Sequence, residues 1–242
     1  MSSLVLHLHG PMQSWGIDAH SNTRPTEHVP TKSALTGLLA SALGRRRGSD
    51  VSDIAALQLV VRVDRVGWEM RDYHTVGAGY PKGGRISMAE GKEREESVAT
   101  LVSNRFYLAD AAFTVAMSGE DDFVAALHEA IRHPCWAPAL GRRSCPPAEP
   151  FVLGVIDVDP VIYLRDELPV VRDTRVFGTS VLFVADDATG AALTIKDMPT
   201  AALNQQGTYG VRRVRRWNEV MDEARFVSDP LTLVAEGVGA DG

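Results

Sequence analysis

Apolar and polar residues alternate, or recur at helical spacing, in several segments of this chain. Alternation and β-branched content predict strands at residues 4–9, 59–66, 111–117 and 151–156. Apolar residues three and four positions apart predict helices at 31–43 and 121–131, with a shorter helix at 51–57. Gly10-Pro11 ends the first strand and Gly44 ends the first long helix. With the short helix set aside, the order is strand, helix, strand, strand, helix, strand.

This order is that of an α+β, ferredoxin-like β-α-β-β-α-β domain, a plan that RNA-recognition modules also use. We expect the domain to occupy residues 1–158. The stretch from about 76 to 104 is glycine-rich and then charged, and it is longer than an ordinary connection, so it is predicted to be a projecting insertion. Short strands and polar turns predict a small β-rich C-terminal lobe at 159–242 with a flexible tail.

The chain is acidic overall, but its basic residues are clustered. Its 242 residues include 25 Lys and Arg and 31 Asp and Glu, a formal net charge of −6. Proteins that bind nucleic acid through the electrostatic field of the whole domain are normally basic. In this acidic chain, any contact with RNA or DNA therefore has to be local. Three clusters offer such contacts: Arg45–Arg47, Arg142-Arg143 and Arg212–Arg216. The first lies at a helix end, where the helix dipole also favours cations.

Several classes of protein do not fit the sequence. No apolar run is long enough to span a bilayer and the first residues do not begin a secretion signal, so we expect a cytoplasmic protein. Cys135 and Cys145 are then expected to be free thiols, and the His and Cys spacing around them does not match a zinc site. Gly77-Ala78-Gly79 does not match a phosphate loop. We therefore expect no metal and no cofactor.

The segment from Pro138 to Pro147 has the composition of a rigid binding loop. Its prolines exclude helix and central strand, while Gly141 can adopt a positive φ. Arg142 and Arg143 carry planar sets of donors that suit phosphate and exposed bases. We interpret this loop as a candidate site for an anionic ligand. The alternative is a solvated turn with two surface arginines.

Four motifs occur together in this chain. They are GPMQSWG at 10–16, RPTEHVPTKS at 24–33, RDYHTV at 71–76 and LGRRSCP at 140–146. In this order and spacing they resemble the Cas-five family of the subtype I-E CRISPR Cascade complexes. The resemblance covers about the first 158 residues well and the rest weakly.

The resemblance implies both a fold and a role. It implies a ferredoxin-like domain whose insertion at about 76–104 is a thumb, within a multisubunit RNA-guided DNA surveillance complex of antiviral defence. Members of the family in this subtype are non-catalytic. They cap the 5′ end of the complex, hold the 5′ handle of the guide RNA, and contact the adjoining backbone subunit and the large subunit. The expected partners are thus guide RNA, these two subunits and, through the complex, target DNA.

The motifs contain the groups that a single-stranded RNA requires, namely cations for phosphates, flat side chains for unstacked bases and glycines for close approach. For Trp15 the alternative is a core anchor, and Arg71 can simply pair with its neighbour Asp72. The predicted RNA-binding residues are Gln13, Trp15, Arg24, Lys32, Ser33, Arg71, Tyr73, His74, Gly141, Arg142, Arg143 and Ser144.

A metal-independent endoribonuclease that processes precursor CRISPR RNA is the alternative function. Related proteins of another subtype cut the repeat themselves. Tyr73, His74 and Arg71 could nominally supply the base, the acid and the cation for attack by a 2′-hydroxyl. Adjacent residues of a strand point to opposite faces, however, so Tyr73 and His74 are not expected to converge on one phosphate. We therefore expect no catalytic residues.

Overall fold

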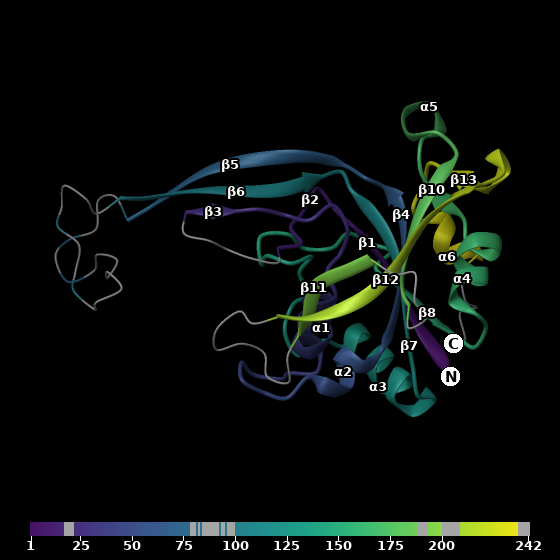
Figure 1. Ribbon diagram of the computed structural model, residues 1–242, viewed down its shortest axis with the longest axis horizontal. Helices are drawn as coiled ribbons and strands as arrows, with labels where there is room; N and C mark the ends of the chain where they lie inside the picture. Colours follow the sequence, from purple (N-terminus) through teal and green to yellow (C-terminus); the bar gives the residue numbers. More distant parts are fainter. Residues whose placement is uncertain are drawn as a thin grey trace.

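The computed structural model is built around a seven-stranded sheet (Figure 1). The structure describes residues 1–16, 22–77, 100–187, 193–199 and 209–236, and the single residues 81, 83, 92 and 95. The strand order is β11-β12-β10-β4-β7-β1-β8, and each neighbouring pair is antiparallel. The strands are β1 (Ser2–His9), β4 (Gln58–Arg65), β7 (Ala112–Gly119), β8 (Val152–Ile156), β10 (Ser180–Asp186), β11 (Leu193–Pro199) and β12 (Tyr209–Val220).

The strands and helices predicted within the first 158 residues are confirmed, with ends that differ by one or two residues. The predicted strands correspond to β1, β4, β7 and β8, which lie side by side in the order β4-β7-β1-β8. Gly44 follows the first helix with a φ of 72°, in the left-handed region that glycine adopts readily. The predicted helices are α1 (Lys32–Ala42), α2 (Ser52–Ala56) and α3 (Asp121–Arg132).

Alternation along the strands gives the sheet an apolar surface on each face. Leu4, Leu6 and Leu8 of β1 point to the face that α1, α2 and α3 cover, and they are fully buried there. Val5 points to the opposite face, into a second core. Each buried leucine contributes about 1.5–3 kcal/mol to folding, so the two cores hold layers on both sides of the sheet.

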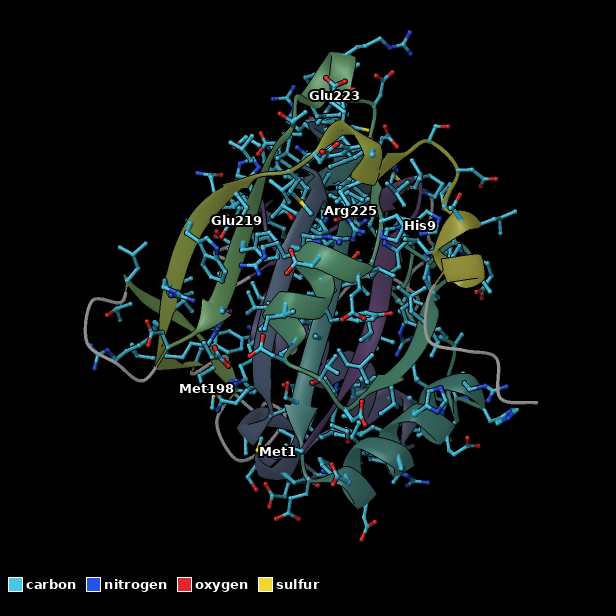
Figure 2. All side chains as sticks on the ribbon, turned by 90° about the vertical axis from the view of Figure 1, so that its right-hand side faces the viewer. Met1, His9, Met198, Glu219, Glu223 and Arg225 are labelled. Carbon is cyan, nitrogen blue, oxygen red and sulfur yellow. The ribbon has the colours of Figure 1, made fainter. Side chains whose placement is uncertain are left out.

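The second core is covered by segments that follow β8. They pack the buried residues Leu164, Leu168, Val170 and Leu233 against that face of the sheet. Figure 2 views the molecule from this side, with these segments in front of the strands. None of the helices in the described ranges is long and apolar enough to cross a membrane. The elements are α4 (Pro160–Ile162), η2 (Tyr163–Glu167), β9 (Val170–Val171), α5 (Thr174–Phe177), η3 (Glu223–Arg225), β13 (Phe226–Val227) and α6 (Thr232–Glu236).

The part predicted as a C-terminal lobe shares the sheet of the first part. β10 pairs with β4, and β12 and β11 follow outward, so three strands after residue 158 extend the same sheet. The sequence pattern predicts that strands exist after residue 158, but it does not predict which strands they pair with. For that reason it favoured a separate lobe over an extension of the first sheet. The division at residue 158 stays a prediction, and the predicted tail lies largely outside the described residues.

A second, smaller sheet projects from the body (Figure 1). β5 (Trp68–Val76) and β6 (Leu101–Ala109) form an antiparallel hairpin, and β2 (Met12–Gln13) and β3 (Thr23–Arg24) pair with the other edge of β6. The predicted thumb at about 76–104 begins and ends on this hairpin, but most of it lies outside the described residues. The hydrophobic pattern did not predict β5 because most of its side chains are exposed, so no buried face imposes an alternation.

A buried polar network lies on β1, β4 and β7, beneath the segments that cover the second core. Arg62 Nε donates to Asp64 Oδ1 at 2.6 Å, and Thr114 Oγ1 donates to Asp64 Oδ2 at 2.5 Å. His7 Nδ1 lies 3.2 Å from Thr114 Oγ1, and all of these side chains are fully buried. Burial alone would raise the pKa of Asp64, but the Arg62 guanidinium and the bonds from His7 and Thr114 lower it to about 2. The carboxylate is therefore charged and fully partnered.

The same arginine holds the covering segments to the sheet. Arg62 Nη1 donates to the carbonyl oxygens of Leu164 and Leu168, the latter at 2.7 Å, and Nη2 donates to that of Pro169 at 2.7 Å. These carbonyls lie in and just after η2, where a helix leaves its last carbonyls without internal partners. Removing one member of a buried ion pair costs about 3–5 kcal/mol, because the other charge is left uncompensated.

We predict that the free energy of unfolding falls as the pH is lowered from about 6.5 to about 4. Burial lowers the pKa of His9 to about 4, and His7 and Arg65 act in the same direction. Burial also lowers the pKa of His7, against the opposing effect of Asp64. Both residues return to an ordinary pKa near 6.5 on unfolding, so the unfolded chain binds more protons within this window.

Urea unfolding at a series of pH values between 7.5 and 4 measures this effect. His9→Gln, which removes one of the two titrations, should decline less steeply than the wild type. Equal slopes for the two proteins, or a wild-type stability that does not change with pH, would contradict the assignment.

Candidate functional site

The first motif builds the core and does not present a base-stacking platform. Gln13 Nε2 donates to the carbonyl oxygens of Leu8 and Ala111 at 2.9 and 2.8 Å, and its Oε1 accepts a bond from Trp15 Nε1 at 3.0 Å. Trp15 is fully buried, with its ring edge-on to that of Phe113. All polar groups of both side chains are therefore used internally. The structure places Trp15 in the core, as the alternative interpretation had it, and RNA binding by Gln13 and Trp15 stays a prediction without a free polar group to support it.

The start of α1 is likewise committed to the fold. The backbone N–H of Lys32 donates to Asp197 Oδ2 at 2.9 Å, and Lys32 Nζ lies 2.8 Å from Asp186 Oδ2. Arg212 bridges the same two carboxylates, from Nε to Asp197 at 2.6 Å and from Nη1 to Asp186 at 2.5 Å. Lys32 is 3% exposed and Ser33 is 9% exposed. Their role in RNA binding stays a prediction that this geometry does not support, because the ammonium is paired and the helix end faces Asp197.

The predicted loop is held in one conformation by its own backbone. Gly141 has a φ of 88°, as predicted, and a Cβ at this position would overlap the carbonyl oxygen of Ser14. Ser14 N donates to the Leu140 carbonyl at 3.1 Å, and Leu140 N donates to the Cys145 carbonyl at 2.7 Å. Burial raises the pKa of the Cys145 thiol, so this side chain acts as an apolar group in the loop. Only glycine fits here, because the loop lies directly against the first motif.

Arg142 fills a gap along one edge of β6. β3 pairs with residues 104 and 105 of that strand and β2 with residues 108 and 109, which leaves the Phe106 carbonyl between them. Ser14 Oγ donates to this oxygen at 3.2 Å and Arg142 Nη1 at 3.3 Å, while Arg142 Nη2 donates to the Arg24 carbonyl at 3.0 Å. The guanidinium carbon lies 4.6 Å from the centroid of the Tyr107 ring. These contacts position the arginine and leave several of its five N–H groups available.

Strand register gathers further arginines beside Arg142. Arg24 of β3 is opposite Arg105 of β6, so their side chains leave the same face of the small sheet. Tyr107, two residues further along β6, is on that face and supports Arg142. Arg143 follows in the loop and is exposed. We call Arg24, Arg105, Arg142 and Arg143 the arginine cluster. In the described part of the chain, no carboxylate forms an ion pair with any of these four arginines.

The third motif is divided between the two faces of β5. Arg71 and Tyr73 point to one face, and Tyr73 is 63% exposed. Asp72 and His74 point to the other face, where His74 Nδ1 lies 3.3 Å from Asp72 Oδ2 and Asp72 is opposite Arg105. Tyr73 and His74 therefore do not meet, as predicted. Of the three residues in this motif that were predicted to bind RNA, only His74 shares a face with the arginine cluster.

Two members of the site were missed in the sequence. Arg105 and Tyr107 belong to the run Asn104–Leu108, beside a segment that showed no hydrophobic pattern. The available signal was the alternation of an arginine and a tyrosine with apolar residues, which is typical of a strand with one basic, aromatic face. Ser144, the last predicted residue, is exposed at the loop, where its Oγ lies 3.8 Å from the Cys145 sulfur.

Comparison with solved structures identifies the class of protein to which this fold belongs. A chain of a "CRISPR RNA-guided surveillance complex" superposes with a TM-score of 0.83 at 33% identity, covering 96% of this chain and 98% of that one. A "Crystal structure of Cas protein" gives a TM-score of 0.68 at 31% identity, covering 94% of this chain and 99% of that one. The mixed α/β, sheet-dominated fold is therefore that of CRISPR-associated proteins.

Sequence comparison identifies the family. The family model described as "CRISPR-associated protein (Cas_Cas5)" matches residues 3–215. The "CRISPR system Cascade subunit CasD" of Escherichia coli (strain K12) is 35% identical over 223 residues, which cover 85% of this chain and 92% of the relative. The chain belongs to the CRISPR-associated Cas5 family, as its motifs indicated.

We predict that Gly141→Ala lowers the free energy of unfolding by more than the strain of a left-handed backbone alone would. Gly48 is the matched control, because it has a similar φ of 86° but open space where a Cβ would lie. Gly48→Ala should cost about 1–2 kcal/mol, the usual price of left-handed backbone for alanine. Gly141→Ala should cost more, since Ser14 must also move. Urea unfolding of both variants measures the difference, and equal losses would contradict the role of the close approach.

Proposed function

We propose that this protein is a non-catalytic subunit of a CRISPR RNA-guided DNA surveillance complex in the cytoplasm, where it serves antiviral defence. In this role it binds and caps the 5′ handle of the guide RNA. Membership of the Cas5 family and the likeness to a Cascade subunit and to a chain of a surveillance complex support the proposal. The observation that carries it is the arginine cluster, held on one face of the small sheet.

The physical match between the cluster and a single RNA strand has three parts. Arginine N–H groups bind phosphate oxygens in pairs, and the cluster supplies four guanidiniums without carboxylate partners among the described residues. The stack on Tyr107 and the bonds to two carbonyls hold Arg142 in place, so less side-chain entropy is lost on binding. Arg105 lies on β6 of the projecting hairpin, so Arg24 and Arg105 extend the cationic surface along it.

We further propose that the first part of the chain is a ferredoxin-like domain and that the hairpin of β5 and β6 is the base of its thumb. The strand order β4-β7-β1-β8 and its antiparallel pairs support the first point, since the β-α-β-β-α-β plan produces that order. The projection of the hairpin from the body supports the second (Figure 1).

The proposed partners are the adjoining backbone subunit and the large subunit of the complex, within a hetero-oligomer. Large apolar side chains are exposed near the base of the hairpin, which is typical of a surface that another protein covers. Trp68 is 62% exposed, Val66 is 46% exposed and Val176 of the nearby α5 is 58% exposed. The Trp68 ring lies 6.3 Å from that of Phe177, so this patch joins β5 to α5.

The geometry of the third motif supports the absence of catalysis. A base and an acid must reach the same phosphate, whereas Tyr73 and His74 leave opposite faces of β5. Within this motif, the pair of His74 and Asp72 is the arrangement that resembles an oriented catalytic base. Incubation of the protein with labelled repeat RNA, followed by a denaturing gel, separates the two functions. Metal-independent cleavage that disappears in His74→Ala would establish the nuclease in place of the capping subunit.

We predict that Arg24→Glu combined with Arg143→Glu weakens binding of the 5′ handle at least about tenfold, by loss of phosphate contacts and by repulsion. Both residues are exposed, so the fold should be unaffected. Arg142 is left intact because its removal would also take a hydrogen bond from each of the Phe106 and Arg24 carbonyls. The matched control is Arg46→Glu with Arg47→Glu, which changes the charge equally at the exposed end of α1.

Handle binding is measured by fluorescence anisotropy with the full chain, and by the RNA content of the complex purified with its other subunits. The control should bind within about twofold of the wild type. Equal weakening in both double variants would show a general charge effect and would contradict a site at the arginine cluster.

A further inference from the structure

The basic cluster Arg212–Arg216 is not explained by the proposed handle site, and the structure divides it. β12 is a strand, so Arg212 and Arg216 leave one face and Arg213 and Arg215 leave the other. Arg212 is buried in the network with Asp186 and Asp197. That network anchors β12 to the start of α1. Arg213 and Arg215 are therefore exposed on a strand whose position is firmly held.

The neighbouring strand leaves this face open. Thr194 of β11 is opposite Arg213 and is exposed, whereas Ile195 is opposite Arg212 and packs on the helix-side core. Beyond Ile195 the register of β11 shifts, so the comparison of faces ends there. Arg213 and Arg215 share one exposed face, which we call the β12 patch.

Arg215 is already arranged for an anion. Its guanidinium carbon lies 4.3 Å from the centroid of the Trp217 ring, and Trp217 stacks on Phe183 at 5.3 Å. The indole is held further by its Nε1, which donates to Glu219 Oε1 at 3.0 Å. A guanidinium held over an indole ring by a cation–π contact still has its planar set of N–H donors available, which suits phosphate oxygens.

The charges around the patch favour an anionic partner. In the described part of the chain, no carboxylate forms an ion pair with Arg213 or Arg215. Two carboxylates lie nearby: Asp187, whose N–H donates to the Arg213 carbonyl at 3.0 Å, and Glu219, which accepts the bond from Trp217 Nε1. Neither forms an ion pair with the two arginines, which therefore keep guanidinium donors for an anion in a chain of net charge −6.

We propose that the β12 patch binds the phosphodiester backbone of a nucleic acid, as a contact separate from the handle site. The arginines repeat every second residue, about 6.7 Å along the strand, which provides a row of cations rather than a single point. Trp217 is covered by Arg215, so the patch offers phosphate contacts and no stacking platform for bases. An interface with a protein would be expected to have an apolar centre, and the patch has a charged one. The inference rests on the proposed function for the presence of RNA and DNA in the complex.

The test compares two faces of one strand. Arg213→Glu and Arg215→Glu reverse charges on the patch, whereas Arg216→Glu makes the same change on the opposite face, where Arg216 is also exposed. Each variant of the full chain is titrated with a single-stranded RNA that lacks the handle, a single-stranded DNA and a DNA duplex, at two salt concentrations. We expect Arg213→Glu and Arg215→Glu each to weaken binding at least about fivefold and to reduce the salt dependence, as loss of a phosphate contact does. Arg216→Glu should stay within about twofold of the wild type. Equal effects of the three variants, or no binding by the wild type, would overturn the proposal.

Photo-crosslinking in the complete complex with its target identifies which strand lies on the patch. A photoreactive phenylalanine derivative is placed at position 213 and, as the control, at position 216. We expect crosslinks to guide RNA or to target DNA from position 213 and none from position 216. The crosslinked strand identifies which nucleic acid supplies the phosphodiester backbone. Crosslinks only to protein would overturn the proposal in favour of an acidic partner subunit. The RNA content of the same sample reports on the handle site, so a complex without guide RNA would refute the proposed function and not this contact.

Discussion

The buried pair of Arg62 and Asp64 is the interaction on which the two-sided arrangement of the molecule depends. It places one guanidinium between a carboxylate of β4 and the carbonyl oxygens at the end of η2. Arg172 makes a second connection of this kind, from its Nη2 to the Val63 carbonyl at 2.7 Å. Apolar contacts alone would let the covering segments slide over the sheet, because the hydrophobic effect has no direction. Hydrogen bonds from arginine to several carbonyls define one position.

A second ionic network does the same for the outer strands. Arg212 and Lys32 share Asp186 and Asp197, so the start of α1 is joined to β10, β11 and β12. Burial alone would lower the pKa of Arg212, but its two carboxylate partners raise it, so the side chain stays charged. Lys32 and Arg212, which the sequence offered as possible RNA contacts, thus stabilise the fold. The remaining exposed arginines are presented by elements that these networks hold in place.

The sequence predicted the parts of the fold that local patterns encode. Leu4, Leu6 and Leu8 predict a strand with one buried face, and Gly141 between prolines predicts a rigid turn. Which cations are free could not be predicted, because Lys32 meets Asp186 across 154 positions of sequence. Arg105 was missed for a similar reason. It becomes part of a site only through the register of β3 with β6 and the support that Tyr107 gives to Arg142.

The position of Arg142 has a consequence for when the site comes into existence during folding. Its bonds reach the carbonyl of Arg24, 118 positions away, and that of Phe106, 36 positions away. Chain segments so distant in sequence meet late, because closing long loops is entropically costly. A partly folded chain therefore lacks the assembled cluster, even though every arginine is already present. The competence to capture a ligand here is a property of the completed fold, so under the proposed function only fully folded subunits would be loaded with RNA.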